Sequence, residues 1–205
     1  MDLETAVTTR RSIRDYKIDP IDELTLREIM KLSLWAPSGR NRQPWYLIVV
    51  RGRKLNEVKE IINCSFDKVQ PSLKASYPDK PHVIETTKKF FSNLGNAPCI
   101  ILTFIPYYQL EIRPEMTLNE RWTQDHFRVG SISAASLVNY NITLFAHERG
   151  LGSCWLTGPL FYTEEISAAV GVRDKELISI LTIGYPENIP SKGPKRKDNV
   201  LEWIE

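Results

Sequence analysis

Three arginines and one serine lie within five residues near the start of the chain, in the segment Arg10-Arg11-Ser12-Ile13-Arg14. Arg10 and Arg14 are one helical turn apart and could face the same way, with the Ser12 hydroxyl as a further donor. Guanidinium groups and a hydroxyl suit a phosphate monoester, because they match several of its oxygens with charge-assisted hydrogen bonds. A solvated basic turn with weak surface ion pairs explains the same residues. On residue types alone, both interpretations stay open.

A second polar segment, residues 36–45, reads Ala-Pro-Ser-Gly-Arg-Asn-Arg-Gln-Pro-Trp and precedes an apolar run. Its small residues favour a turn with exposed backbone N–H groups, and the amide side chains of Asn41 and Gln43 add donors and acceptors. This mixture suits the edge of a heteroaromatic ring or a polyol chain. The alternative is a connecting loop in which Asn41 and Gln43 satisfy the loop's own backbone.

The other reactive residue types are scattered along the chain. They are three cysteines and three histidines: Cys64, Cys99, Cys154, His82, His126 and His147. No pair has the short spacing of a metal site or a redox motif, so we expect no metal and predict buried free thiols at Cys99 and Cys154. The sequence also contains no Ser/His/Asp or Cys/His constellation. Residue spacing therefore indicates no catalytic side chain.

The composition is that of an ordinary globular protein. The 205 residues are 42% hydrophobic and 25% charged, with a formal net charge of +2. This charge is too small to indicate a nucleic-acid partner. No apolar run reaches the roughly 20 residues of a membrane span, and the start Met1-Asp2-Leu3-Glu4 does not resemble a signal peptide. We expect a cytoplasmic protein with one domain, residues 1–205.

Apolar spacing and turn residues predict alternating helices and strands. The predicted helices are residues 2–10, 22–35, 52–62, 86–94, 127–148 and 163–170, and the predicted strands are residues 46–50, 99–105, 153–156 and 177–183. Pro71, Pro78 and Pro81 are expected to interrupt residues 63–96, and residues 106–126 are expected to be irregular. Strands that alternate with helices predict a three-layer sandwich of the α+β or α/β class.

The tail, residues 187–205, has a polar part followed by a short apolar part. The polar part contains the cluster Lys195-Arg196-Lys197, and residues 200–204 read Val-Leu-Glu-Trp-Ile. An isolated apolar peptide must bury its side chains elsewhere. We expect an extended arm that adds a strand to the sheet, such as that of a second subunit.

Several segments together resemble the nitroreductase family. They are Arg-Arg-Ser-x-Arg at residue 10, Pro-Ser-x-x-Asn-x-Gln-Pro-Trp at residue 37, Asn141 with Leu144 and Ala146, Gly150-Leu151-Gly152-Ser153-Cys154-Trp155, and Ile183-Gly184-Tyr185-Pro186. They occur in the family's order over most of the chain, which favours the phosphate interpretation of the basic segment. The resemblance implies a mainly antiparallel sheet in a three-layer α-β-α sandwich. It also implies a homodimer that binds FMN at the subunit interface, with the C-terminal arm exchanged.

The resemblance assigns cofactor contacts to three groups of residues. The phosphate and the pyrimidine edge are assigned to Arg10, Arg11, Ser12 and Arg14; the partner subunit's contacts to Pro37, Ser38, Gly39, Asn41 and, more weakly, Gln43; and the neighbourhood of flavin N5 to Leu156, Thr157 and Gly158. In the tail, one residue of the cluster Lys195, Arg196 and Lys197 is expected to reach the phosphate, with Arg196 favoured, although a solvated basic tail is the alternative.

The implied activity is a ping-pong transfer of hydride from NAD(P)H through flavin N5 to a small organic acceptor, such as a nitroaromatic or a quinone. Arg14 is the candidate for stabilising the anionic reduced flavin. Residues 63–96 and 107–128 depart from the family pattern and leave the acceptor open. The alternatives are a flavin-dependent dehalogenase or dehydrogenase of the same fold, oxygen-dependent flavin breakdown, a non-catalytic flavin-binding protein and a nucleic-acid-binding module.

Overall fold

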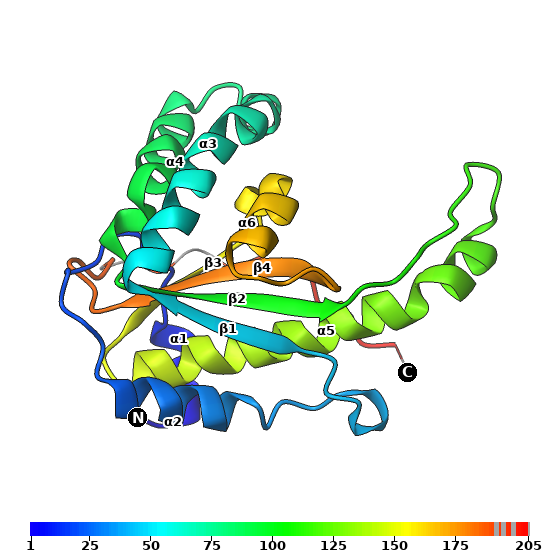
Figure 1. The fold of residues 1–205 in the computed structure, drawn as a ribbon. Coiled ribbons are helices and arrows are strands. Elements are labelled where there is room, and N and C mark those ends of the chain that lie inside the picture. Colours follow the sequence, from blue (N-terminus) through cyan, green and yellow to red (C-terminus); the bar gives the residue numbers. More distant parts are fainter. Residues whose placement is uncertain (191–192, 194–195, 198–199, 205) are drawn as a thin grey trace.

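A four-stranded antiparallel sheet forms the centre of the molecule (Figure 1). The computed structural model describes residues 1–190, 193, 196–197 and 200–204. In spatial order the strands are β1 (Tyr46–Arg51), β2 (Cys99–Pro106), β4 (Lys175–Gly184) and β3 (Gly152–Leu156). Each of the four strands predicted from apolar runs is therefore present.

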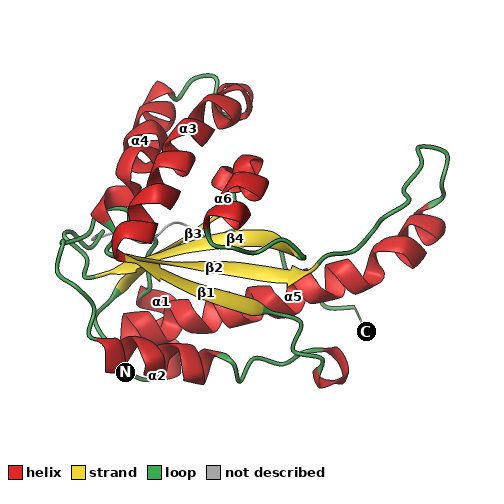
Figure 2. Cartoon of the chain, viewed as in Figure 1, coloured by secondary structure: helices red, strands yellow, loops and turns green. Residues whose placement is uncertain are grey.

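Helices cover both faces of this sheet (Figure 2). On one face lie α3 (Gly52–Ser76), α4 (Pro81–Asn93) and α6 (Thr163–Ala169), and on the other lie α1 (Leu3–Thr9), α2 (Glu23–Ser33) and α5 (Leu118–Glu148). Two clusters of buried apolar residues fill the two spaces between sheet and helices. The fold is thus the expected three-layer α+β sandwich.

Strand β2 shows why the core has two halves. Ile100, Leu102 and Phe104 belong to the cluster under α3 and α4, whereas Cys99 and Ile101 belong to the cluster beside α2 and α5. Successive side chains of a strand point to opposite faces, so an uninterrupted apolar run supplies both layers. Burying each large aliphatic side chain in this way contributes about 1.5–3 kcal/mol.

A buried polar cluster fixes α5 on the sheet. Thr103 of β2 donates to Asn139 Oδ1 at 2.7 Å, and Asn139 Nδ2 donates to Ser179 Oγ of β4 at 2.7 Å. All three residues are 0% exposed. Because unsatisfied polar groups are costly in an apolar interior, this cluster stabilises one register of α5 against β2 and β4.

Helix α5 begins earlier than the sequence pattern predicted. The expected irregular segment 106–126 is non-regular only as far as Thr117, where α5 starts with a capping box. Thr117 N–H donates to Glu120 Oε2 at 2.8 Å, and Glu120 N–H donates back to Thr117 Oγ1 at 3.3 Å. The first turns of α5 and the loop before it extend beyond the sheet (Figure 1), with Trp122 and Phe127 exposed.

Helix α3 corrects a second expectation, because Pro71 does not interrupt it. The helix continues to Ser76 with Pro71 inside, while Phe66 and Val69 pack into the core. Proline removes one hydrogen bond to the carbonyl four residues earlier. Both Pro71 and Asp67 are exposed, so water can hydrate that carbonyl, and the buried face of α3 keeps its contacts. Pro81 also starts a helix, since it stands at the first turn of α4.

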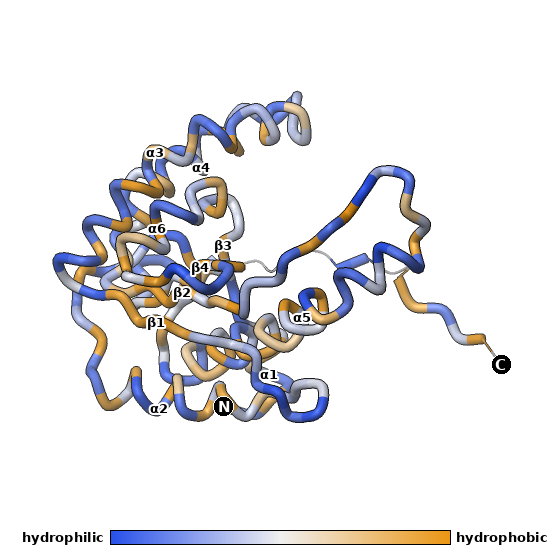
Figure 3. Tube along the Cα trace, turned by 45° about the vertical axis from the view of Figure 1, so that its right-hand side comes forward, coloured by the Kyte–Doolittle hydropathy of each residue, from blue (hydrophilic) through white to orange (hydrophobic). Residues whose placement is uncertain are grey.

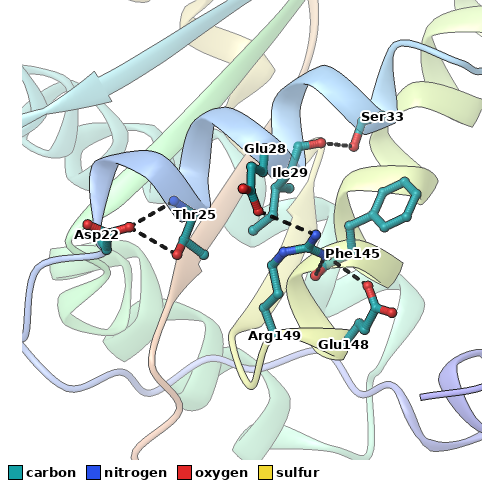
Figure 4. A network of polar contacts seen from close by, with 8 residues as sticks. All are labelled: Asp22, Thr25, Glu28, Ile29, Ser33, Phe145, Glu148 and Arg149. Carbon is teal, nitrogen blue, oxygen red and sulfur yellow. Dashed lines mark hydrogen bonds and ion pairs between the residues drawn. The ribbon is translucent and has the colours of Figure 1, made fainter.

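Polar contacts lie at the start of α2 and between α2 and the end of α5 (Figure 4). Asp22 Oδ2 accepts from the backbone N–H of Thr25 at 2.9 Å and caps the helix. Arg149, directly after the last residue of α5, contacts Glu28 of α2 at 3.8 Å and Glu148 of α5 at 2.8 Å. These ion pairs are partly exposed and contribute little energy. They lie between α2 and the end of α5, and α2 leads into the 37–43 loop.

The C-terminal residues 200–204 form no regular element and are exposed. Figure 3 shows that this end extends away from the rest of the chain. Its apolar side chains, Val200, Leu201, Trp203 and Ile204, are 71–89% exposed. In a single chain, residues 200–204 add no strand to the sheet, and the exchanged arm stays a prediction.

Candidate functional site

The basic segment is extended, which corrects the expectation that Arg10 and Arg14 lie one helical turn apart. Helix α1 ends at Thr9, and Ser12 forms a parallel bridge with Ser153 of β3. Ile13 N–H donates to the Ser153 carbonyl at 3.0 Å, and the Ile13 side chain is buried. An extended segment rises about 3.3 Å per residue, more than twice the rise of a helix, so Arg10 and Arg14 lie far enough apart to serve different parts of a site.

Arg10 and Arg11 line a small cavity of about 220 Å³. The Nε atoms of both are buried and have no hydrogen-bond partner among the described residues. Arg11 Nη1 donates to the carbonyls of Thr8 and Arg10, each at 2.8 Å, which holds its guanidinium at the end of α1. Within the described part of the chain, neither arginine forms a salt bridge. Buried guanidinium donors without an anion are suited to receive one.

His147, on the last turn of α5, lines the same cavity. Its Nε2 lies 2.8 Å from Thr9 Oγ1. Partial burial, together with the nearby charges of Arg10 and Arg11, holds the pKa of His147 below its ordinary value. The sequence did not indicate a role for His147, because no local pattern shows that the end of α5 contacts the end of α1.

Arg14 faces a larger cavity, of about 850 Å³, between the sheet and the α3–α4 hairpin. Leu156, Thr157 and Gly158, which follow β3, line the same cavity. The structure therefore brings Arg14 and the predicted 156–158 segment together. Lining residues not predicted from the sequence include Val69, Leu73, Lys89, Phe91, Asn93 and Trp155. Helical apolar spacing predicts burial of Phe91, but no local pattern places it against Gly158.

The backbone of Arg14 is held from two sides. On one side, the Tyr16 hydroxyl lies 2.6 Å from the Ile13 carbonyl and 2.7 Å from Thr182 Oγ1. On the other side, Tyr16 N–H donates to the Gly95 carbonyl at 2.8 Å. A Cβ added to Gly95 would lie 2.1 Å from the Arg14 carbonyl oxygen, so only glycine fits there. Burial raises the pKa of Tyr16 and keeps its hydroxyl protonated.

The predicted 37–43 loop is exposed and strained. Arg40, Asn41 and Gln43 all have positive φ angles, of 54°, 53° and 47°. Such backbone costs on the order of 1–3 kcal/mol per residue and is concentrated at functional sites. Ser38 supports the loop, since its Oγ accepts from Gln43 N–H at 2.9 Å and its carbonyl accepts from Asn41 N–H at 2.9 Å. Asn41 and Gln43 thus bond partly within the loop, as the alternative interpretation expected.

Within one chain this loop is far from the basic segment. Both segments contact α5, and the distance between the two contacts gives their separation. The loop touches α5 at Phe127, whose ring centroid lies 4.8 Å from the Arg42 guanidinium carbon. The basic segment touches α5 at His147, through Thr9. Twenty helical residues at 1.5 Å each put these two contacts about 30 Å apart. One chain therefore joins Arg10–Arg14 to residues 156–158, but not to Pro37, Ser38, Gly39 and the rest of the loop.

The tail returns to the basic segment. A Cβ added to Gly193 would lie 2.5 Å from Arg11 Nη2, so the chain at Gly193 passes beside that guanidinium. Arg196 is exposed three residues further on, while Lys195 lies outside the described residues.

The described part of the chain contains neither a cluster of metal-binding residues nor a helix that could span a membrane. Its histidines, cysteines and carboxylates form no group of three or more that could hold a metal ion. Likewise, among its described helices none combines the length and the apolar character needed to cross a membrane.

Comparisons with a family model, with related sequences and with solved structures each find nitroreductases. Residues 7–185 match the nitroreductase family. A Bacillus subtilis protein described as an NAD(P)H nitroreductase is 29% identical over 191 residues, which cover 92% of this chain and 86% of the relative. An iodotyrosine deiodinase of Thermotoga neapolitana is 27% identical over 200 residues, or 92% of this chain and 90% of the relative. The FMN-dependent nitroreductase NfnB of Mycobacterium smegmatis, solved with NADPH, has the same fold, with a TM-score of 0.71 at 18% identity over 98% of this chain and 97% of that chain.

Proposed function

The chain belongs to the nitroreductase family of oxidoreductases, and from this premise we propose that it binds FMN and uses NAD(P)H to reduce a small organic acceptor. The two substrates use one pocket in turn. The acceptor is a nitroaromatic or quinone-like molecule. The whole chain acts as one domain, with residues 187–205 as its arm.

The observation that carries this proposal is the pair of cavities joined by the extended basic segment. Arg10 and Arg11 line the small cavity and have buried Nε atoms without a hydrogen-bond partner among the described residues, and Arg14 lines the large cavity beside residues 156–158. Arg10 and Arg14 are four residues apart, and four residues of extended backbone span at most about 13 Å. This arrangement fits a phosphate at the first cavity, a ring in the second, and a ribityl chain past Ser12. Arg196 reaches the phosphate from the tail.

The roles of the cofactor and of the residues around it follow from these positions. When bound, FMN supplies hydride transfer at its N5 atom. Arg14 stabilises negative charge on the pyrimidine edge of the ring, because a guanidinium favours the anionic form of a neighbouring group. The apolar walls of the large cavity, including Val69, Leu73 and Phe91, exclude water and accept a flat aromatic substrate. No side-chain nucleophile is required.

A second copy of the chain completes the site. The 37–43 loop lies about 30 Å along α5 from the basic segment, so its contacts reach a flavin bound by the other subunit. The arm has a matching surface. Strand β1 is at the edge of the sheet, and a groove of about 560 Å³ lies beside it. Apolar residues such as Leu26, Met30 and Trp45 line this groove, together with the charged residues Glu23, Arg27, Lys31 and Arg51. Residues 200–204 of a second copy fit there as an added strand.

The visible absorption spectrum of the purified protein tests the cofactor. Bands of oxidised flavin, in a protein that elutes as a dimer, would support the proposal, and a colourless protein that takes up no FMN would refute it. Oxidation of NADH and NADPH with nitroaromatic and quinone acceptors, with and without oxygen, then tests the reaction. A yellow protein that oxidises neither nucleotide would instead be a non-catalytic flavin protein.

The similarity to an iodotyrosine deiodinase favours reductive dehalogenation as the second candidate. Release of iodide from iodotyrosine by the reduced protein, at a rate above that of nitroaromatic reduction, would select it.

A further inference from the structure

We propose that His147 couples the binding of the FMN phosphate to the uptake of one proton, so that the protein holds FMN more tightly as the pH falls from about 8 to about 6.5. This inference rests on the proposed function. His147, Arg10 and Arg11 line the same cavity of about 220 Å³. An anion bound between the two arginines therefore also faces the imidazole.

The hydrogen bonds of Thr9 determine which ring nitrogen is available. Thr9 Oγ1 lies 2.6 Å from the Thr5 carbonyl, which can only accept, so the single hydroxyl proton is donated there. Oγ1 must then accept from His147 Nε2, at 2.8 Å. Nε2 carries a proton in both charge states of the ring, and Nδ1 is the atom that gains or loses one.

The charges around the ring set the direction of the coupling. The residues that face it from α1 and the basic segment are Thr9, Arg10 and Arg11, and Met1 lines the same cavity. Residues 150–153, Pro186 and Ile189, which also line the cavity, carry no charged side chain. On α5 itself the neighbouring charges are Glu148 and Arg149, which pair with each other.

Without an anion, burial and the two arginines lower the pKa of His147. A phosphate monoester brings a charge of about −1.5 to −2 and reverses the sign of the local field. Binding therefore raises the pKa of His147 and takes up a proton wherever the pH lies between the free and the bound value. Because the second phosphate pKa is about 6, protonation of the ligand weakens binding below that pH. The gain is thus confined to the window above it.

Flavin fluorescence measures this coupling directly, with FMN and riboflavin as the two probes. Riboflavin lacks the phosphate and serves as the ligand control. The proteins are the native chain, His147→Gln and the matched control His126→Gln, whose site lies on the projecting part of α5. We expect the Kd of FMN for the native chain and for His126→Gln to fall by about fivefold from pH 8 to pH 6.5, which corresponds to a rise of about two units in the pKa of His147. For His147→Gln, and for riboflavin, we expect less than about a twofold change.

An NMR titration of the His147 ring in the native chain is independent of how well the variant folds. We expect its pKa to rise by about two units when FMN is added, and not when riboflavin is added. An unchanged pKa, or a pH dependence that survives in His147→Gln, would overturn the inference while leaving the proposed function in place. Failure of both flavins to bind at either pH would overturn both.

Discussion

Replacing Gly95 with alanine should displace Arg14 and weaken flavin binding. Gly95 has a φ of +61°, and an added Cβ would lie 2.1 Å from the Arg14 carbonyl oxygen. That oxygen must retreat by close to 1 Å before the contact reaches 3.0 Å, a limit that Cβ atoms essentially never cross. The same movement pulls on the hydrogen bond from Tyr16 N–H to the Gly95 carbonyl.

Two costs add in this variant. A left-handed backbone at a non-glycine residue costs about 1–2 kcal/mol, and overpacking against backbone costs a further 1–3 kcal/mol or so. We therefore expect a loss of about 3 kcal/mol in the free energy of unfolding. Moving the Arg14 guanidinium out of hydrogen-bond range should also weaken FMN binding by about tenfold or more, since such a bond to a charged group contributes about 1.5–3 kcal/mol.

Gly171→Ala is the matched control. Gly171 has a φ of +77°, and nothing lies within 4 Å of its added Cβ, so this variant carries the backbone cost without the collision. We expect it to lose about 1 kcal/mol of stability and no flavin affinity. Urea unfolding and flavin fluorescence titration measure the two quantities. Equal losses of stability in the two variants, or unchanged FMN affinity in Gly95→Ala, would refute the idea that Gly95 positions Arg14.

Three further outcomes follow from the structure. Arg14→Ala should lower FMN affinity by about tenfold and make the flavin harder to reduce, because the cation beside the ring is lost; an unchanged Kd and reduction potential would remove Arg14 from the site. Thr103→Val should cost about 1–3 kcal/mol in urea unfolding, because it leaves buried Asn139 Oδ1 without its donor, and a loss near zero would show that the cluster contributes nothing. A thiol reagent at pH 8 should label the exposed Cys64 alone in the native protein, since burial raises the pKa of Cys99 to about 12; rapid labelling of more than one thiol would contradict this.

Local patterns predicted the four strands and the approximate place of each helix. Apolar runs such as Cys99–Ile105 are long enough to decide the structure by themselves. The start of α5 was also readable, since Thr117 and Glu120 have the spacing of a capping box. It was missed because the first turns of α5 carry no apolar stripe. The prediction that Pro71 interrupts a helix was wrong, because the contacts of Phe66 and Val69 with the core outweigh one lost hydrogen bond.

The residue types of the proposed site can be read from the sequence, whereas their arrangement in space cannot. Three arginines beside a serine suit a phosphate, but a solvated basic turn explains the same residues, and only the resemblance to the family favoured the phosphate. Their extended backbone depends on Ser153, and the position of Arg14 depends on Gly95. Both partners are far away in the sequence, and no window of neighbouring residues contains them. His147 was missed for the same reason, because α5 must first be packed against α1.

The separation of the loop and the basic segment along α5 has a consequence for mixtures of variants. In the proposed dimer, each site takes its basic segment from one chain and its 37–43 loop from the other. Two inactive variants, one damaged in each part, would then form mixed pairs in which one site is wholly intact and the other carries both defects. Activity would reappear on mixing, up to half of that of the native pair for each mixed dimer. Two recessive lesions in one gene would complement each other.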